Sequence, residues 1–398
     1  MPAPRKGNPF RIHGVVSEQF FTDRASEIDR ILKTFREPGA KLLVYGPRRM
    51  GKTSALVTAI ARHEAEGGVA FLADMSTAST IVDIANRILE AAGRSLGRKW
   101  KDSISDFVER LGLTLTLTAD PATGVIRPSL DVRLRSAPLE EQRTSLSKTL
   151  DSIDGLAKAR KTPFGIVLDE FQEIRRFGGD TAEWHLRGVI QHHQNVSYVL
   201  AGSQAHLIER MLDKGRAFYG LADQLLVGAI DPAHLAAWID DRMTQGGVKA
   251  AGVGAAIIAR AGPRTRDIVQ VARRCFDNCR TTGRAGEAAV AQAYEDVVAE
   301  QEALFQSAWN GLTGQQQNIL RAVAADLDGL TTKASLRQFA LTSSGAASNS
   351  ARAMVDAGFL VRASSRTGYS FETPFFGYWV RRATMADLGA ALPLDPEG

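Results

Sequence analysis

The chain has 398 residues, of which 44% are hydrophobic, and this length exceeds the size at which one core usually suffices, so two or three domains are expected. No stretch approaches the roughly 20 apolar residues that span a bilayer, and the polar start lacks a secretory apolar region, so we expect a cytoplasmic protein without a membrane partner. The net charge is +5, and residues 1–62, with twelve Lys or Arg against five Asp or Glu, carry the whole excess, so the basic balance belongs to this end at least as much as to any separate DNA-binding surface.

The first elements predict one βαβ unit with a glycine-flanked loop inside it. Apolar residues at helical spacing predict a helix that ends near residue 35, and residues 41–45 are β-prone. A helix over residues 52–63 and a strand over residues 69–75 follow. In the loop between the first strand and that helix, successive backbone N–H groups and a helix N-terminus can converge on one anion. This predicted phosphate loop consists of Gly46, Pro47, Arg48, Arg49, Met50, Gly51, Lys52, Thr53 and Ser54.

Residues 94–139 interrupt the α/β pattern. Residues 111–118 and 130–135 both alternate strictly between apolar and polar, with a turn region between them, and this predicts an inserted β-hairpin. The chain then returns to the sheet. The other elements expected in this part are helices at 80–92 and 139–158 and strands at 164–168, 196–201 and 225–230.

The second half of the chain changes character twice. From residue 231 to about residue 304 the periodicity is helical throughout, which predicts an all-helical domain after an α/β domain of residues 1–230. Residues 305–398 then predict three helices followed by a two-stranded wing, the pattern of a winged helix. Those elements are helices at 315–325, 335–340 and 346–357 and strands at 359–363 and 369–372.

The winged helix has two possible uses. The third helix presents Ser348, Asn349, Ser350 and Arg352 on its outer turns, and Arg366 lies at the tip of the wing, where each could contact duplex DNA. Residues 305–398 nevertheless hold eight basic and seven acidic side chains, a weak balance for neutralising phosphates. Double-stranded DNA and a protein surface therefore both remain possible partners.

Two pairs of residues carry the chemistry expected at the phosphate loop. Lys52 can reach the β- and γ-phosphates of a nucleotide, and the hydroxyl of Thr53 can hold Mg²⁺. Asp169 ends an apolar strand of parallel type, at the sheet edge where ligands collect, and is the candidate for the carboxylate beside the metal. Glu170 can then activate or orient the attacking water. The alternative is that both carboxylates are solvated groups at a strand end.

The order of these motifs resembles the AAA+ ATPases, in particular their STAND-like branch with an appended winged helix, called archaeal-type ATPases. The resemblance covers about residues 8–385. It implies an α/β P-loop fold with a parallel sheet, an α-helical lid and a C-terminal winged helix, and it implies ATP and Mg²⁺ as ligands. The carriers are FFTDRASEI, GPRRMGKTS, FGIVLDEFQEI, VSYVLAGS, KGRAFYGLADQLLVGAI and AGPRTRDI.

The same resemblance implies roles for four further residues. Ser203 occupies the place of the first sensor, at the end of the strand next to the one with Asp169, although many members have Asn there. Arg216 lies where oligomeric members keep an arginine that completes the nucleotide site of a neighbouring subunit. Arg210 is the alternative candidate for this role. Arg264 and Arg266 lie where the lid would carry its second sensor of the γ-phosphate, and spacing does not decide between them.

Two segments are expected to support the site. In the family the N-terminal box packs over the adenine, which implies contacts from Val15, Val16 or Phe20, with Asp23, Arg24 and Glu27 holding the turn; a plain hydrophobic staple is the alternative. Asp74, Ser76 and Thr77 follow the second strand. They could hold Glu170 in an inactive position, or they could cap the next helix.

The sequence thus favours an ATP-hydrolysing molecular switch. In the first hypothesis it is a DNA-associated ATPase. In the second it is a STAND-like signalling ATPase whose winged helix mediates protein association, either within a homo-oligomer or with another protein, without DNA binding.

Overall fold

A computed structural model describes residues 7–12, 22–96, 115–119, 126–326, 329–363 and 365–385 of the protein. The chain forms two compact units, His13–Ala229 and Ile230–Gly398, and the second unit also includes Met1–Ile12. No helix among the described residues has the length and apolarity that a membrane crossing requires.

The first unit is built on a five-stranded sheet. Its strands are β1 (Lys41–Tyr45), β2 (Val69–Asp74), β5 (Phe164–Asp169), β6 (Val196–Gly202) and β7 (Asp223–Leu226). They are arranged in the order β2-β5-β6-β1-β7, and every neighbouring pair is parallel. The carboxyl ends of all five strands therefore lie at one edge, and β1 and β5 are separated by β6 alone. The predicted fold class, an α/β P-loop architecture with a parallel sheet, is confirmed.

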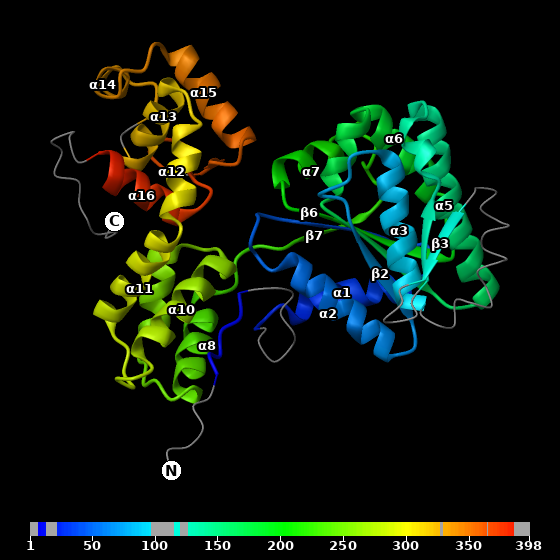
Figure 1. Ribbon diagram of the computed structural model, residues 1–398, viewed down its shortest axis with the longest axis horizontal. Helices are drawn as coiled ribbons and strands as arrows, with labels where there is room; N and C mark the ends of the chain where they lie inside the picture. Colours follow the sequence, from blue (N-terminus) through cyan, green and yellow to red (C-terminus); the bar gives the residue numbers. More distant parts are fainter. Residues whose placement is uncertain are drawn as a thin grey trace. The chain divides into compact units, whose positions relative to one another are not determined.

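Helices cover both faces of this sheet (Figure 1). Along β1, Leu42 and Val44 face α1 and α2, whereas Leu43 packs with the core on the side of α3, α5 and α6. Burial on both faces explains why these strands read as continuous apolar runs. The helices of this unit are α1 (Ala25–Arg36), α2 (Lys52–Ala65), α3 (Ile81–Leu96), α5 (Leu139–Arg160), α6 (Asp180–Ile190) and α7 (Ala205–Leu212), with the 3₁₀ helix η4 (Phe171–Phe177) after β5.

The insertion differs from its predicted strands. β3 (Leu115–Ala119) pairs antiparallel with β4 (Ile126–Leu130), so a hairpin is present. The strand predicted over residues 130–135 is wrong, because Val132–Ser136 forms a 3₁₀ helix, η3. The carboxylate of Asp131 accepts a hydrogen bond from the N–H of Arg133 at 2.9 Å and turns the chain. Residues 111–114 lie outside the described residues.

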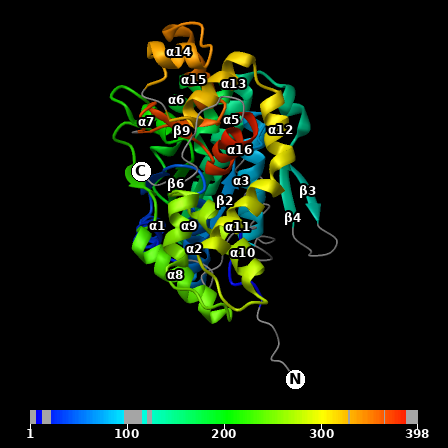
Figure 2. The same ribbon diagram turned by 90° about the vertical axis from the view of Figure 1, so that its left-hand side faces the viewer.

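In the described part of the second unit, the regular elements are helices and a two-stranded wing. Its lid-like part has α8 (Pro232–Gln245), α9 (Val253–Ala261), α10 (Thr265–Cys279) and α11 (Glu287–Glu300). The rest has α12 (Glu302–Asn310), α13 (Gly314–Ala324), α14 (Lys333–Gln338), α15 (Ser344–Asp356), β8 (Leu360–Arg362), β9 (Tyr369–Phe371) and α16 (Pro374–Thr384). The three helices and antiparallel wing predicted from sequence are present, and α16 is an addition. Figure 2 shows α16 beside α12 and α13.

One hydrophobic core runs through this whole unit. It joins Phe276 and Val297 of the lid-like part to Phe375 and Trp379 of α16. Phe10, which is fully buried, adds the N-terminal segment to the same core by packing against Trp238 and Phe276. The division of residues 231–398 into a lid and a separate winged-helix domain stays a prediction.

Candidate functional site

The predicted phosphate loop connects β1 to α2 and depends on two glycines. Gly51 caps α2 with a φ of +90°, a left-handed conformation that glycine adopts without strain. Gly46 has a φ of +150°, and a Cβ there would lie 2.2 Å from the carbonyl oxygen of Val227. The same segment is bonded to the loop, because the N–H of Val227 donates to Tyr45 O at 2.7 Å. The loop is thus packed directly against the chain that leaves β7.

Lys52 lies across the interior of this loop. Its ammonium group donates to the carbonyl oxygens of Gly46 at 2.8 Å and Pro47 at 2.6 Å, and the residue is 7% exposed. An ammonium group that faces the interior of the loop in this way can donate to phosphate oxygens as well as to carbonyl oxygens. Pro47, Arg48 and Arg49 are exposed, whereas Met50 is buried and Ser54 is partly buried within α2.

Thr53 and Asp169 meet although 116 positions separate them in the sequence. The Thr53 hydroxyl donates to Asp169 Oδ2 at 3.0 Å, and Asp169 is 6% exposed. Burial raises the pKa of Asp169 to about 6, and the neighbouring charges of Glu170 and Asp74 add to this rise, while the hydrogen bond from Thr53 opposes it. A hydroxyl and a carboxylate at this separation are a donor set that suits Mg²⁺.

Glu170 follows Asp169 in a strained backbone conformation. Its φ is +53°, a left-handed value that a residue with a Cβ adopts at a cost of about 1–2 kcal/mol. The side chain is held at one oxygen, because Oε2 accepts hydrogen bonds from Ser203 at 2.7 Å and from Gln172 at 2.6 Å. The ends of β5 and β6 are thereby joined at the edge of the sheet where the phosphate loop lies.

Gln172 is a site residue that the sequence reasoning missed. It is 3% exposed, and its Oε1 atom has no hydrogen-bond partner among the described residues. A Cβ at Gly202 would lie 2.5 Å from that atom, so the glycine makes room for the amide. An amide side chain two positions after a strand-end acidic pair is the signal that could have drawn attention to Gln172.

The residues expected to hold Glu170 have other partners. The Asp74 carboxylate accepts from the N–H of Ser76 at 2.8 Å, and the hydroxyl of Thr77 accepts from Arg87. These bonds stabilise the chain after β2 but do not cap α3. The first turn of that helix is capped by Thr80, whose hydroxyl accepts from the N–H of Asp83 at 3.1 Å. Arg48 approaches the site instead, since its Nε lies 3.4 Å from the hydroxyl of Ser203.

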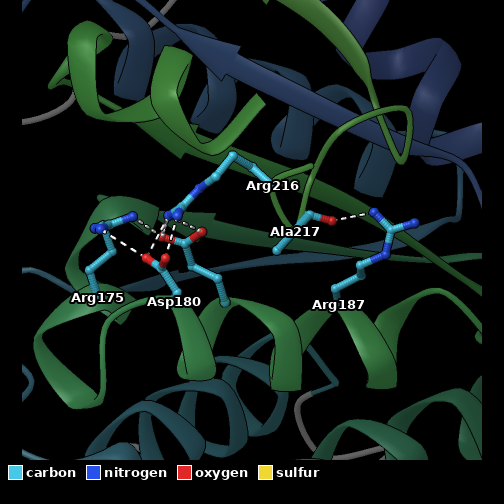
Figure 3. Close-up of polar contacts among 6 residues, drawn as sticks. Arg175, Asp180, Arg187, Arg216 and Ala217 are labelled. Carbon is cyan, nitrogen blue, oxygen red and sulfur yellow. Dashed lines mark hydrogen bonds and ion pairs between the residues drawn. The ribbon is translucent and has the colours of Figure 1, made fainter. Parts of the chain in front are cut away.

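Arg216 takes part in an ion-pair cluster of its own chain (Figure 3). Its guanidinium binds both carboxylate oxygens of Asp180, with 2.6 Å to Oδ1, and lies 3.3 and 3.4 Å from the oxygens of Glu183. Arg175 binds the same two carboxylates. Burial raises the pKa of Glu183, which is fully buried, and the two arginines oppose that rise. To act on a neighbour's nucleotide, Arg216 would have to exchange these partners, so its role stays a prediction.

The segment that carries Arg216 is fixed to α6 a second time. Arg187 donates to the carbonyl oxygen of Ala217 (Figure 3) and also to that of Tyr219, at 3.3 Å. In the same segment, Phe218 packs edge-on against Phe171, with ring centroids 4.9 Å apart. Phe171 directly follows Glu170, so this segment is in packing contact with the end of β5.

The two candidate lid arginines differ in their surroundings. Arg264, just before α10, is buried and forms an ion pair with Glu372 beside the wing, at 3.1 Å. Arg266, in the first turn of α10, is exposed. Both belong to the second compact unit, and a role for either at a nucleotide stays a prediction. Val15, Val16 and Phe20, expected at the adenine, lie outside the described residues.

Comparisons with known proteins agree with this architecture. A family model described as an ATPase domain predominantly from Archaea matches residues 21–235. A search of curated proteins gave no match. Among solved structures, a Walker-type ATPase of Pyrococcus abyssi is similar over 94% of this chain and 99% of its own, with a TM-score of 0.63 at 14% identity. The ORC1 protein of Aeropyrum pernix, solved in complex with DNA, is similar over 91% of this chain and 93% of its own, with a TM-score of 0.51 at 15% identity.

Proposed function

Because this chain belongs to the family of ATPase domains found predominantly in Archaea and is an ATPase of that family, we propose that it is a Mg²⁺-dependent molecular switch driven by ATP. The observation that carries the proposal is the hydrogen bond between Thr53 and Asp169. It joins the helix that follows the phosphate loop to the acidic pair at the end of β5, as a shared site for triphosphate and metal requires.

In this proposal the phosphate loop binds the triphosphate and Lys52 contacts its β- and γ-phosphates. Thr53 and Asp169 would hold Mg²⁺, which supplies charge neutralisation on the phosphate oxygens when it is bound. Ionised Asp169 is the better ligand, and its raised pKa means that acid competes with the metal below about pH 6.

Glu170 is proposed as the general base. Its carboxylate accepts a proton from water while the water oxygen attacks the γ-phosphorus, and the bond from that phosphorus to the β,γ-bridging oxygen breaks to release ADP and phosphate. The bonds from Ser203 and Gln172 fix the carboxylate for this task. Ser203, as first sensor, would also be close to the γ-phosphate.

The test is a pair of variants in a phosphate-release assay with a parallel nucleotide-binding assay. Lys52→Ala is expected to lose nucleotide binding, because the phosphates lose their cation. Glu170→Gln is expected to bind ATP and to lose turnover, because an amide accepts no proton at neutral pH. Hydrolysis by Glu170→Gln at the wild-type rate would show that the general base is another group.

We also propose that the output of the switch is an association with double-stranded DNA. The exposed side chains of Asn349 and Arg352 on α15 and of Arg362 and Arg366 in the wing support this, because they are the positions from which a winged helix reaches a duplex. Gel-shift titrations across salt concentrations, with and without ATP, are the test. A complex that weakens steeply with salt is expected, and the absence of a salt- or ATP-dependent complex on any duplex would remove this output.

The second candidate output is protein association in a STAND-like signalling switch. It is favoured by the core that the wing-bearing helices share with the lid-like helices, because that packing occupies part of the winged-helix surface. In a homo-oligomer Arg216 would act on the neighbour's nucleotide. Mixing Arg216→Ala with Lys52→Ala subunits should then restore some hydrolysis, since one mixed interface combines an intact arginine with an intact phosphate loop.

A further inference from the structure

Arg24 is buried in the first unit at the turn that precedes α1. It is 3% exposed, and it follows Asp23 in a pair of left-handed residues with φ values of +58° and +70°. Two consecutive left-handed conformations are unusual at residues that carry a Cβ, and the one at Arg24 is strained. Such strain persists only where the surrounding contacts fix the conformation. Here the contacts that fix the conformation are those of the Arg24 guanidinium.

That guanidinium joins three segments that are far apart in the sequence. Nη1 donates to Glu27 Oε1 at 2.6 Å. Nη2 donates to the carbonyl oxygen of Met50, in the phosphate loop, at 3.1 Å, and also to the carbonyl oxygen of Gly228, just after β7. Burial pushes the pKa of Glu27 upward, but hydrogen bonds from Ser26 and Arg24 outweigh this effect and the pKa lies below its ordinary value. Arg24 therefore faces an ionised partner.

The bond to Met50 has a consequence for the next N–H group. In a trans peptide the carbonyl and the N–H point in opposite directions across one rigid plane. Because Arg24 holds the carbonyl of Met50, the N–H of Gly51 is turned to the other side of the same peptide, away from Arg24. Gly51 is the cap of α2, where N–H groups have no acceptor within the helix and are available to an anion.

We propose that Arg24 is a positioning residue for phosphate binding, which orients the Met50–Gly51 peptide so that the Gly51 N–H faces the nucleotide. This inference rests on the proposed function of the loop and assigns one of its amide donors to a specific partner outside the loop. Packing alone does not require an arginine here. A buried guanidinium carries a desolvation penalty that methionine, of similar length, would avoid.

The chemistry of the contact also separates arginine from lysine. A planar guanidinium can donate from two nitrogens at once, to a carboxylate and to two carbonyl oxygens, whereas an ammonium group is a single point on a flexible stem. Arg24→Lys should retain the charge beside Glu27 and lose the fixed direction of the bond to Met50. The main test variant is Arg24→Met, which keeps the length of the side chain and removes its donors. Arg24→Lys is the variant to use if Arg24→Met does not fold.

The sequence permits a direct view of this peptide. Met50-Gly51 is the only place in the 398 residues where Gly follows Met. Labelling with carbonyl-¹³C methionine and ¹⁵N glycine therefore gives one carbonyl-to-amide correlation in an HNCO spectrum, from the Met50 carbonyl and the Gly51 N–H. In wild type we expect the carbonyl resonance of a hydrogen-bonded group, and a shift of the Gly51 amide when MgATP is added.

In Arg24→Met the carbonyl resonance should move upfield, and MgATP should bind about tenfold more weakly, the effect of one charge-assisted bond. Arg30→Met is the matched control, because Arg30 lies on α1, directly after the turn that holds Arg24, and its exposed side chain pairs with exposed Asp223. It should leave both the correlation and the affinity unchanged. A role in stability alone would lower the melting temperature without moving this resonance.

Two results would overturn the inference. One is an HNCO correlation that is the same in Arg24→Met or Arg24→Lys as in wild type. The other is a wild type that binds MgATP together with a folded Arg24→Met that binds it equally well. If wild type itself fails to bind MgATP, the proposed function fails, while the correlation measured without nucleotide still decides whether Arg24 fixes the peptide.

Discussion

At the scale of single residues, the site includes polar side chains that are almost fully buried, among them Lys52, Asp169 and Gln172. Asp169 shows the consequence most clearly. Its carboxyl group lies at the end of a fully buried strand, where ionisation is costly, and its pKa is raised to about 6. The ordinary value for an aspartate is about 3.9. The folded protein therefore binds this proton more tightly than the unfolded chain does, and ionisation of Asp169 destabilises the fold.

The sign of the pH effect follows from this difference. Between about pH 4 and pH 6 the folded state holds more protons, so its stability falls as the pH rises through that window. Asp169→Asn removes the ionisation but weakens the hydrogen bonds that the carboxylate accepts from Thr53 and from the N–H of Glu170, so the variant should be more stable than wild type at pH 8 by roughly 1–2 kcal/mol. The gain should vanish near pH 4.5. Urea denaturation without nucleotide at both pH values measures it, and a gain that is equal at both would contradict this cause.

Gln172 should act through Glu170. Replacing it with methionine keeps the volume and removes the donor at 2.6 Å, so the general base loses part of its orientation. We expect kcat to fall about tenfold while KM changes less than about twofold, because Gln172 contacts Glu170 and none of the residues proposed to bind ATP. Gln191→Met, on an exposed side chain after α6, is the control. Steady-state kinetics in which kcat stays at the wild-type value would show that Glu170 needs no support from Gln172.

At the scale of elements, the sequence predicted the sheet well because its strands are buried on both faces and flanked by clear turns. β1, β2, β5 and β6 lie where the apolar runs predicted them. The strand predicted over residues 225–230 is shifted in the structure, where β7 spans Asp223–Leu226. The chain after β7 packs against Gly46. The sequence predicts a strand where the structure has the 3₁₀ helix η3. The alternation of apolar and polar residues there fits a strand, and it does not reveal that Asp131 caps a turn.

Contacts between elements could not be read from the sequence in the same way. The sequence predicts four site residues because each lies in a short local motif: Lys52, Thr53, Asp169 and Glu170. Gln172 lies in the FGIVLDEFQEI segment, but the segment alone does not single it out, because its role depends on the space that Gly202 leaves on a neighbouring strand. The approach of the chain after β7 to the phosphate loop is equally non-local and appears only in the fold.

That approach leads to a prediction at Gly46. A methyl group at this position would lie 2.2 Å from Val227 O, and backbone cannot move aside cheaply, so Gly46→Ala should destabilise the first unit by about 3 kcal/mol or more. Gly67→Ala is the control. Gly67 also has a positive φ, +88°, but nothing lies within 4 Å of a Cβ there, so a cost of only about 1 kcal/mol is expected. Equal losses in urea denaturation would show that the packing against Val227 carries no cost.

At the scale of the whole molecule, the second unit joins parts that the sequence presents as separate. The lid-like helices and the wing-bearing helices share one core, and Arg264 and Glu372 form an ion pair across them. Tyr294 of α11 packs against Phe375 and Tyr378 of α16, and Glu295 binds Tyr378 and Arg382. Because of this shared core, the lid-like helices and the wing-bearing helices form one packed body.

This arrangement predicts a single cooperative unfolding unit. Amides of α11 and α16 should exchange with solvent with the same free energy of opening, since neither helix can leave the shared core alone. Hydrogen exchange read by mass spectrometry measures both. In Glu372→Gln the two values should fall together, because the substitution removes the negative charge that faces the buried guanidinium of Arg264. Opening of α16 at much lower free energy than α11 would show that the winged helix is an independent module.

The central claim is that the phosphate loop and the acidic pair at the end of β5 bind triphosphate and metal together. Calorimetric titration of ATP into Glu170→Gln, with Mg²⁺ and then with EDTA, tests this claim most directly, because the variant retains both binding elements while turnover is removed. We predict saturable binding of ATP that is much tighter with Mg²⁺ than in EDTA. We also predict that Asp169→Asn abolishes this tighter binding. Binding of equal affinity in EDTA, or no binding by folded protein, would contradict it.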